Sequence, residues 1–273
     1  MERNPDRSSP RLLVSVRNKE EAHEAIAGGC DILDVKDPQH GSLGAATASV
    51  ISEIADVGHD ASIPVTAALG ECAEWQELTQ PLNPEAISGS GLQFVKLGLA
   101  AIGHREDWST QWRNVTALCS QKLGPGTRHV AVIYADWEAA RAPHPQSILD
   151  AISERRQAGS PGANFAGVLI DTFEKSSGRL LDAMSLELLH EVREQTAQLG
   201  MCLALAGRLN EESLPQLVEF SPDIVAVRSA ACRGEDRNSS VDRDAVSQFR
   251  EAMQSHFEPL VKTAPVNGGV RHA

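Results

Sequence analysis

The sequence has little lysine, few aromatic residues and no long apolar run. Lysines make up only six of the 25 basic residues, and aromatic residues only 4% of the chain. No apolar run approaches the ~18 residues that a membrane helix requires, so we expect no membrane partner. The net charge is −12 and no four basic residues occur in succession, which argues against nucleic acid as a partner.

The five cysteines are scattered along the chain and include no C-x-x-C pair. An odd, unpatterned set of this kind is typical of reduced intracellular thiols, and it predicts neither a disulfide framework nor a zinc site. The first 11 residues are polar and include two prolines, without the apolar segment of a secretory signal. We therefore expect a cytoplasmic protein with no metal site.

Eight apolar segments alternate with helical patterns over about 250 residues, which is the normal content of a (β/α)8 barrel. A doubly wound sheet is the alternative, but it usually carries a glycine-rich turn after its first strand, and Ser15–Asn18 has none. We predict an α/β protein with a single TIM-barrel domain, 11–258, between a disordered leader, 1–10, and a flexible tail, 259–273. The expected strands are 11–16, 31–36, 63–69, 92–97, 129–134, 165–170, 201–206 and 223–227.

Helix signals are clear after the first expected strand and poor after the third. Asn18 is expected to cap a helix, with Glu21 as its capping-box partner three residues later. After the third strand, the pattern predicts a helix from about residue 74 to 87 that Pro81 and Pro84 interrupt.

Two lysines occupy positions where a strand would place a core residue. Side chains two apart on a strand share a face, so Lys36 lies with Asp34 and Lys96 lies with Phe94. Burying an unpaired ammonium is very costly, so a structural role does not explain these lysines. Asp171 ends another strand, with Lys175 in the loop that follows. In a barrel such strand ends meet at the carboxyl-terminal rim, where active sites of this fold lie.

Several lysines in one pocket indicate carbonyl chemistry, because a neutral amine attacks a carbonyl carbon. Lowering a lysine pKa from about 10.4 to about 7 requires ~4–5 kcal/mol of preference for the neutral form. Burial and a second nearby ammonium both act in that direction. A lysine pair therefore favours Schiff-base formation by one amine and proton transfer by the other, while Asp34 and Asp171 offset the charge and shuttle protons.

Loops after the last two strands of this fold commonly bind phosphate. Here they contain arginines, backbone amides and a hydroxyl, which are the groups that bind phosphate oxygens. The alternative is that the two arginines are rim residues paired with acidic side chains. The phosphate-binding candidates are Gly207, Arg208, Arg228, Ser229 and Ala230.

The segment DILDVKDPQHGSLGA, residues 31–45, resembles the signature of the (5-formylfuran-3-yl)methyl phosphate synthase family. A chance match over fifteen residues is implausible. The likeness continues through shorter matching segments and covers the chain from about residue 12 to 257. Those segments are 94–98, 169–172, 203–207, 227–232 and 234–238, and the departures fall at 16–17, 70–75 and 207–208.

This resemblance implies a cofactor-free lyase of methanofuran biosynthesis, with the barrel fold. Such an enzyme condenses two glyceraldehyde 3-phosphate molecules into a furan and releases phosphate and water. By matching motifs, Lys36 would form the Schiff base and Lys96 would be the proton acceptor. Asp34, Asp171 and Lys175 would support them. The implied partner is a small phosphorylated molecule, and a homo-oligomer is compatible with the sequence.

Two alternatives remain open at the level of sequence. One is another class I, Schiff-base aldolase of phosphorylated sugars. The other is a barrel that binds a phosphorylated metabolite without turning it over.

Overall fold

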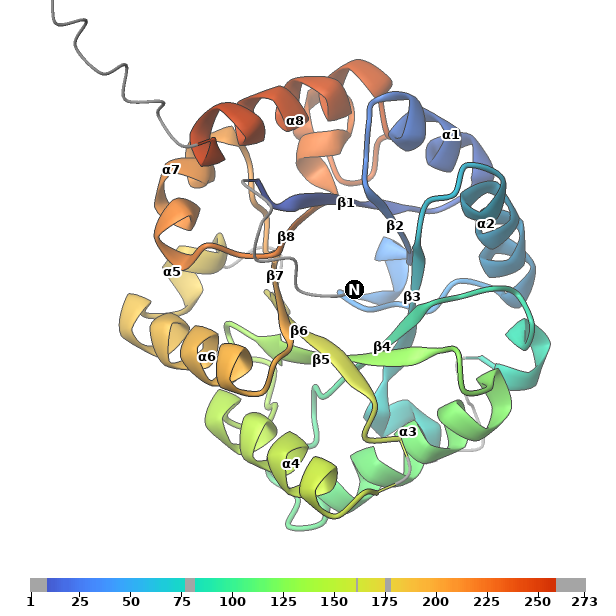
Figure 1. Ribbon diagram of the computed structural model, residues 1–273, viewed down its shortest axis with the longest axis vertical. Coiled ribbons are helices and arrows are strands. Elements are labelled where there is room, and N and C mark those ends of the chain that lie inside the picture. Colours follow the sequence, from blue (N-terminus) through green and yellow to red (C-terminus); the bar gives the residue numbers. More distant parts are fainter. Residues whose placement is uncertain (1–8, 77–81, 161, 175–177, 259–273) are drawn as a thin grey trace, which may run out of the picture.

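The computed structural model describes residues 9–76, 82–160, 162–174 and 178–258 of the chain. Eight parallel strands close into a barrel in sequence order, β1 to β8, which confirms the predicted fold (Figure 1). The strands are β1 Arg11–Val16, β2 Ile32–Val35, β3 Val65–Glu71, β4 Phe94–Gly98, β5 Arg128–Tyr134, β6 Phe165–Asp171, β7 Cys202–Leu205 and β8 Ile224–Val227.

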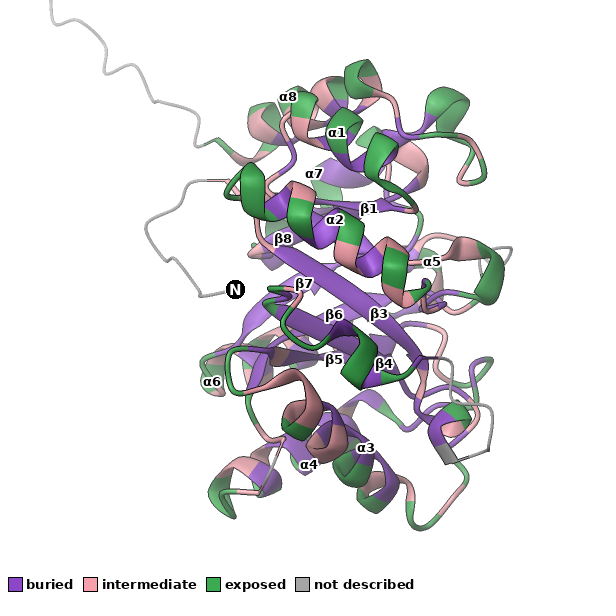
Figure 2. Ribbon diagram, turned by 90° about the vertical axis from the view of Figure 1, so that its right-hand side faces the viewer, coloured by how far each residue is buried: buried purple, intermediate pink, exposed green. Residues whose placement is uncertain are grey.

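Helices surround the barrel as an outer ring (Figure 1). Their outward faces are exposed and their inward faces are buried, whereas the strands are buried on both faces (Figure 2). Within the described ranges, no helix is long and apolar enough to cross a membrane. The helices are α1 Lys19–Ala27, α2 Ala48–Asp60, α3 Trp108–Leu123, α4 Pro145–Gln157, α5 Leu180–Ala183, α6 Leu186–Gln198, α7 Leu214–Leu217 and α8 Arg243–Phe257.

Side-chain alternation along each strand separates two apolar layers. On β4, Val95 packs in the layer between strands and helices, and Phe94 packs inside the barrel. Below the carboxyl-terminal end of the strands, the barrel interior is thus filled with side chains, as is usual for this fold. Lys96 shares the inward side of Phe94, as the two-residue period predicts.

The prediction of a helix from about residue 74 to 87 is wrong for the residues that the structure describes. Two short 3-10 helices stand there instead, η2 Cys72–Gln76 and η3 Pro84–Ile87. Proline has no backbone N–H and clashes with the preceding turn, so an α-helix does not continue through such a segment. Residues 77–81, including Pro81, lie outside the described part, as do 1–8 of the expected leader and all of the expected tail.

The predicted cap of α1 is half right. The Asn18 side chain accepts a hydrogen bond from the Glu21 backbone N–H, as an N-cap should. The Glu21 carboxylate, however, accepts from the backbone N–H of Arg17 and pairs with two arginines. Glu21 is therefore part of a buried ion-pair network, which the capping-box pattern did not reveal.

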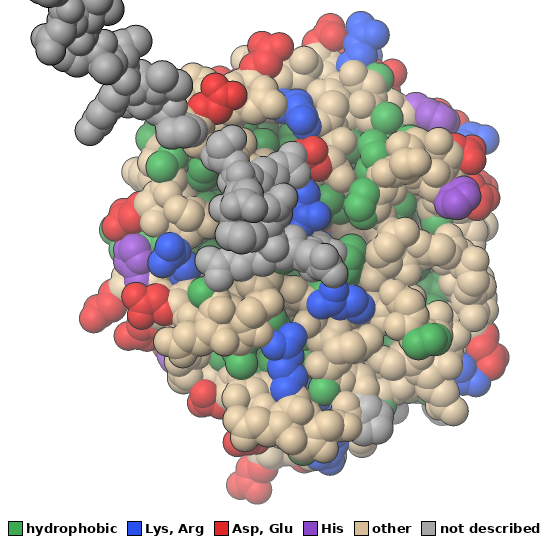
Figure 3. Space-filling model, viewed as in Figure 1, with side chains coloured by type: hydrophobic (Ala, Val, Ile, Leu, Met, Phe, Trp, Pro, Cys, Tyr) green, Lys and Arg blue, Asp and Glu red, His purple; other side chains and the backbone are tan. Residues whose placement is uncertain are grey.

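Charges are spread unevenly over the face of the molecule in Figure 3. Acidic side chains lie mainly along its outer edge, over the helices, and basic side chains are interspersed with neutral surface. This distribution accompanies the net charge of −12.

Candidate active site

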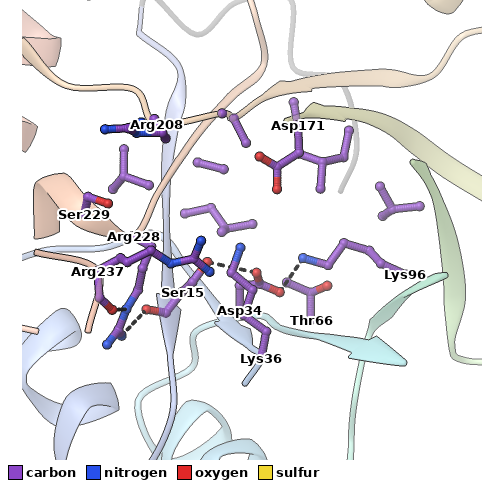
Figure 4. Close-up of a pocket in the computed structure, with 18 residues that line it drawn as sticks. Ser15, Asp34, Lys36, Thr66, Lys96, Asp171, Arg208, Arg228, Ser229 and Arg237 are labelled. Carbon is purple, nitrogen blue, oxygen red and sulfur yellow. Dashed lines mark hydrogen bonds and ion pairs between the residues drawn. The ribbon is translucent and has the colours of Figure 1, made fainter. Parts of the chain in front are cut away.

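A pocket of about 700 Å³, its open mouth included, lies at the carboxyl-terminal end of the barrel. Its floor is apolar, and its polar lining comes from the ends of several strands (Figure 4). The structure brings eight of the ten predicted site residues together here. They are Asp34, Lys36, Lys96, Asp171, Gly207, Arg208, Arg228 and Ser229.

Asp34 and Lys96 form a buried ion pair inside the pocket. Their exposed fractions are 1% and 3%, and the Lys96 Nζ contacts Asp34 Oδ1. The other carboxylate oxygen, Oδ2, accepts a hydrogen bond of 3.0 Å from the Ser15 hydroxyl. The β1–β2 register sets Ser15 beside Asp34, so the carboxylate is held by Ser15 of β1 and by Lys96 of β4.

Burial lowers the pKa of Lys96 below the ordinary lysine value. The Asp34 carboxylate opposes this effect, while the positive charge of Lys36 adds to it. The net direction is downward, so the neutral amine of Lys96 is more available than that of a surface lysine. A neutral amine held beside a carboxylate can accept a proton.

Lys36 follows β2 and continues its ladder, because its backbone N–H donates to Val16 O at 3.2 Å. The amines of Lys36 and Lys96 lie on either side of the Asp34 carboxylate (Figure 4). Over the described ranges, the Lys36 amine donates to no protein acceptor, whereas that of Lys96 is paired. The Lys36 amine is therefore the more accessible of the two.

Asp171 lies across the pocket, held by the loop that follows β2. The Ser42 hydroxyl is 3.1 Å from Asp171 Oδ2 and 3.0 Å from the carbonyl oxygen of Thr172. A hydroxyl has one proton and two lone pairs, so it can donate to an ionised Asp171 or accept from a protonated one. In the second case Ser42 donates to Thr172 O instead, so the contact with Ser42 suits either form of the carboxyl group.

The far end of the pocket is lined by Gly207, Arg208 and Ser229. Gly207 has φ 102°, and a Cβ there would lie 3.0 Å from Thr172 Cγ2, so only glycine fits this turn without strain. Arg208 follows this turn and lies at the pocket wall. Ser229 lies at the same wall and comes from the end of the neighbouring strand β8. This arrangement suits an anion.

Three predicted residues stand differently. The Arg228 guanidinium donates five hydrogen bonds of 2.5–3.1 Å to protein oxygens, so the alternative of a rim arginine paired with an acid describes it better. Ala230 packs against the outer apolar layer and does not line the pocket. Lys175 lies outside the described residues.

A model of the 4-HFC-P synthase family matches residues 12–250, which is most of the chain. The chain belongs to the 4-HFC-P synthase family. It is 37% identical to the (5-formylfuran-3-yl)methyl phosphate synthase of Methanococcus maripaludis strain C7 over 239 residues, 87% of this chain and 97% of that protein. The synthase of the same name from Methanocaldococcus jannaschii is 36% identical over 88% of this chain and 98% of that protein.

Solved structures similar to this 4-HFC-P synthase family member support the fold alone. Thiamine phosphate pyrophosphorylase from Pyrococcus furiosus has a TM-score of 0.57 at 12% identity, covering 93% of this chain and 99% of that chain. The 3-hexulose-6-phosphate synthase from Salmonella typhimurium has a TM-score of 0.55 at 13% identity, with coverages of 90% and 99%.

Sequence reasoning missed four polar residues of this site. Ser15 and Thr66 sit at inward strand positions beside Asp34, and the two-residue period could have found both. The Thr66 hydroxyl is buried and, within the described chain, has no hydrogen-bond partner. Ser42 and Arg237 come from loops, and no periodic signal marks a loop residue.

Proposed function

We propose that this 4-HFC-P synthase family member condenses two glyceraldehyde 3-phosphate molecules into (5-formylfuran-3-yl)methyl phosphate. The atoms balance when one phosphate and two water molecules are released. The observation that carries the proposal is the placement of two lysine amines around one carboxylate, in a pocket whose far wall is cationic. We further infer that the reaction takes place in the cytoplasm, needs no cofactor and supplies the furan of a methanofuran-type molecule.

Lys36 is the proposed nucleophile. Its amine attacks the carbonyl carbon of one triose phosphate, the carbonyl oxygen departs as water, and a carbon–nitrogen double bond forms. The adjacent Asp34 carboxylate stabilises the positive charge of that iminium. Hydrolysis of the same bond at the end of the cycle returns the free amine.

Lys96 is the proposed base. Its neutral amine takes a proton from the carbon next to the iminium, which leaves an enamine. The enamine carbon attacks the carbonyl carbon of the second triose phosphate, so a carbon–carbon bond forms as the carbon–oxygen π bond breaks. The carbonyl oxygen then takes up a proton and becomes a hydroxyl group. Burial favours the neutral form of Lys96 before each proton transfer, and Asp34 accepts a hydrogen bond from the protonated form after it.

Asp171 is the proposed proton donor for the departing oxygens. Its contact with Ser42 supports this role, since that hydroxyl can stabilise either protonation state. The proposed binding site for a substrate phosphate is the wall formed by Gly207, Arg208 and Ser229. The family resemblance also assigns a supporting role to Lys175.

The test is incubation of the enzyme with glyceraldehyde 3-phosphate as the sole substrate. We expect one phosphate to be released for each furan that appears in the ultraviolet spectrum. Another Schiff-base aldolase would consume substrate without a furan band, and a binding barrel would leave the substrate intact. Either of these results would refute the proposal.

Substituting Asp34 should move the pH dependence of the reaction in a defined direction. In the parent enzyme kcat/KM should rise with pH as Lys96 loses its proton. The midpoint of this rising limb of the pH profile should lie below the ordinary lysine pKa. Asp34 raises the Lys96 pKa, so Asp34→Asn should shift the limb to lower pH, whatever happens to the absolute rate. A limb that stays in place or moves upward would exclude Lys96 as the titrating base.

Removing the Ser42 hydroxyl should slow the reaction with little effect on substrate binding. A hydrogen bond to a charged group contributes about 1.5 kcal/mol or more, so Ser42→Ala should lower kcat by about tenfold. The matched control is Ser49→Ala, because Ser49 is exposed on α2. Equal kcat values for the two variants would show that Ser42 does not assist Asp171.

A further inference from the structure

Arg237 extends into the pocket from the segment between the 3-10 helix η7, Arg233–Glu235, and α8. Its guanidinium points toward the centre of the pocket, near Asp34 and Lys36 (Figure 4). The guanidinium of Arg228 points the other way, toward Ser15 and the backbone of Arg237 (Figure 4). Two arginines that lie side by side thus have opposite orientations.

The guanidinium of Arg237 has unused hydrogen-bonding capacity. Over the described ranges its one hydrogen bond runs from Nη2 to Pro38 O, at 3.3 Å. A guanidinium has five N–H donors arranged as a planar fork, so most of them remain available to a ligand. Arg228, by contrast, donates five hydrogen bonds to protein oxygens.

The surroundings of Arg237 are partly desolvated and rich in positive charge. Burial lowers the Arg237 pKa, Asp171 opposes that effect, and the charges of Arg228 and Arg208 add to it. Arginine nevertheless stays protonated in proteins. Two cations, Arg208 and Arg237, therefore line one wall of the pocket together with the Ser229 hydroxyl.

Two other arginines hold the backbone that carries Arg237. Arg228 donates to the carbonyl oxygens of Arg237 and Ser239, at 3.1 and 2.9 Å. Arg17 donates to the carbonyl oxygens of Asn238 and Ser239, at 3.0 and 3.2 Å. The backbone from 237 to 239 is thereby held by two side chains. Arg17 follows β1, and Arg228 follows β8, the strand paired with β1.

Glu21 of α1 holds both of these arginines. Its two carboxylate oxygens lie 2.5 and 3.0 Å from the Arg228 guanidinium, and Oε1 lies 2.6 Å from Arg17 Nη2. The exposed fraction of the Glu21 side chain is only 3%. Such a buried, multiply hydrogen-bonded pair fixes geometry more than it adds stability.

We propose that Arg237 binds a phosphate group of the substrate and that Glu21, Arg17 and Arg228 are positioning residues that set its location. The ligand class is a phosphate monoester, which the planar fork can hold through two parallel hydrogen bonds. This inference rests on the proposed function, because it concerns the phosphorylated substrate of the same pocket. It moves the phosphate contact predicted for Arg228 to Arg237.

The direct test compares Arg237→Ala with Arg233→Ala. Arg233 is the matched control, since it belongs to the same loop region, is 76% exposed and pairs with Asp242 outside the pocket. We expect the dissociation constant of inorganic phosphate, measured by calorimetry, to rise about 10- to 150-fold in Arg237→Ala. Arg237→Lys should recover only part of this affinity, because lysine keeps the charge without the fork. Equal phosphate binding by Arg237→Ala and the control would overturn the proposal.

The positioning role is tested by combining substitutions. Arg17 is 25% exposed, so Arg17→Ala does not leave a deeply buried cavity, and a thermal melt checks that it is folded. We expect Arg17→Ala to weaken phosphate binding in the parent but not in the Arg237→Ala background, because it acts through Arg237. The KM for glyceraldehyde 3-phosphate should follow the same pattern. Effects that add in the double variant would exclude the positioning role.

The failure of this inference can be told apart from failure of the proposed function. If Arg237→Ala binds phosphate more weakly but the parent enzyme makes no furan, the phosphate contact is supported and the proposed reaction is refuted. A parent enzyme that makes furan, with undiminished phosphate binding in Arg237→Ala, would refute the phosphate contact alone.

Discussion

Replacing Lys36 by arginine should abolish both the covalent adduct and furan formation. Arginine keeps the positive charge and most of the length of lysine, but its guanidinium stays protonated and does not attack a carbonyl carbon. We expect the furan band to fall to the level of an enzyme-free sample. Borohydride reduction in the presence of substrate should add no mass to the variant.

The control for Lys36→Arg is Lys122→Arg. Lys122 lies on α3, is 36% exposed and pairs with Glu85 on the surface, so its substitution should leave turnover unchanged. Substantial furan formation by Lys36→Arg would show that the substrate is held without a Schiff base at this position. The alternative of a barrel that binds a phosphorylated metabolite without turnover also requires that Lys36→Arg be tolerated. Under that alternative, neither the parent nor Lys36→Arg would produce furan.

Replacing Lys96 should separate adduct formation from product formation. Without the base, the Lys36 amine can still form its imine, but the proton abstractions that lead to condensation and aromatisation stop. We expect Lys96→Ala to be trapped at Lys36 by borohydride while furan formation falls by about 10²- to 10⁴-fold.

Loss of Lys96 also leaves the buried Asp34 carboxylate without its ion-pair partner, which costs about 3–5 kcal/mol of stability. Lys96→Gln serves as the second variant, because its amide can still donate a hydrogen bond to Asp34 but does not act as a strong base. Circular dichroism establishes that each variant is folded. Normal turnover, or a folded variant that is not trapped, would contradict the division of roles between Lys36 and Lys96.

The barrel could be predicted because its pattern is local. Short apolar segments alternate with helical stripes, and the two-residue period of a strand assigns each side chain to a face. The same period predicted inward-facing side chains for Asp34 on β2 and Lys96 on β4, and the structure joins them in an ion pair inside the barrel. A charged residue at an inward strand position was thus a stronger signal than any loop motif.

The environment of Arg228 could not be predicted, because it depends on contacts distant in sequence. Its partner Glu21 is 207 positions away, in α1, and the pattern around Asn18 suggested a local capping box for Glu21 instead. The orientation of Arg237 follows from backbone contacts that form only once α1 packs beside the β8 loop. Loop conformation of this kind has no periodic signature in a sequence.

The most direct test of the reaction is peptide mapping of the enzyme after borohydride reduction with glyceraldehyde 3-phosphate. Trypsin does not cleave after an alkylated lysine, and the lysines of interest are well separated from other basic residues. An adduct on Lys36 should yield a modified peptide spanning 20–96, and we expect this product. An adduct found instead on the peptide spanning 37–105 would place the Schiff base on Lys96 and contradict the mechanism.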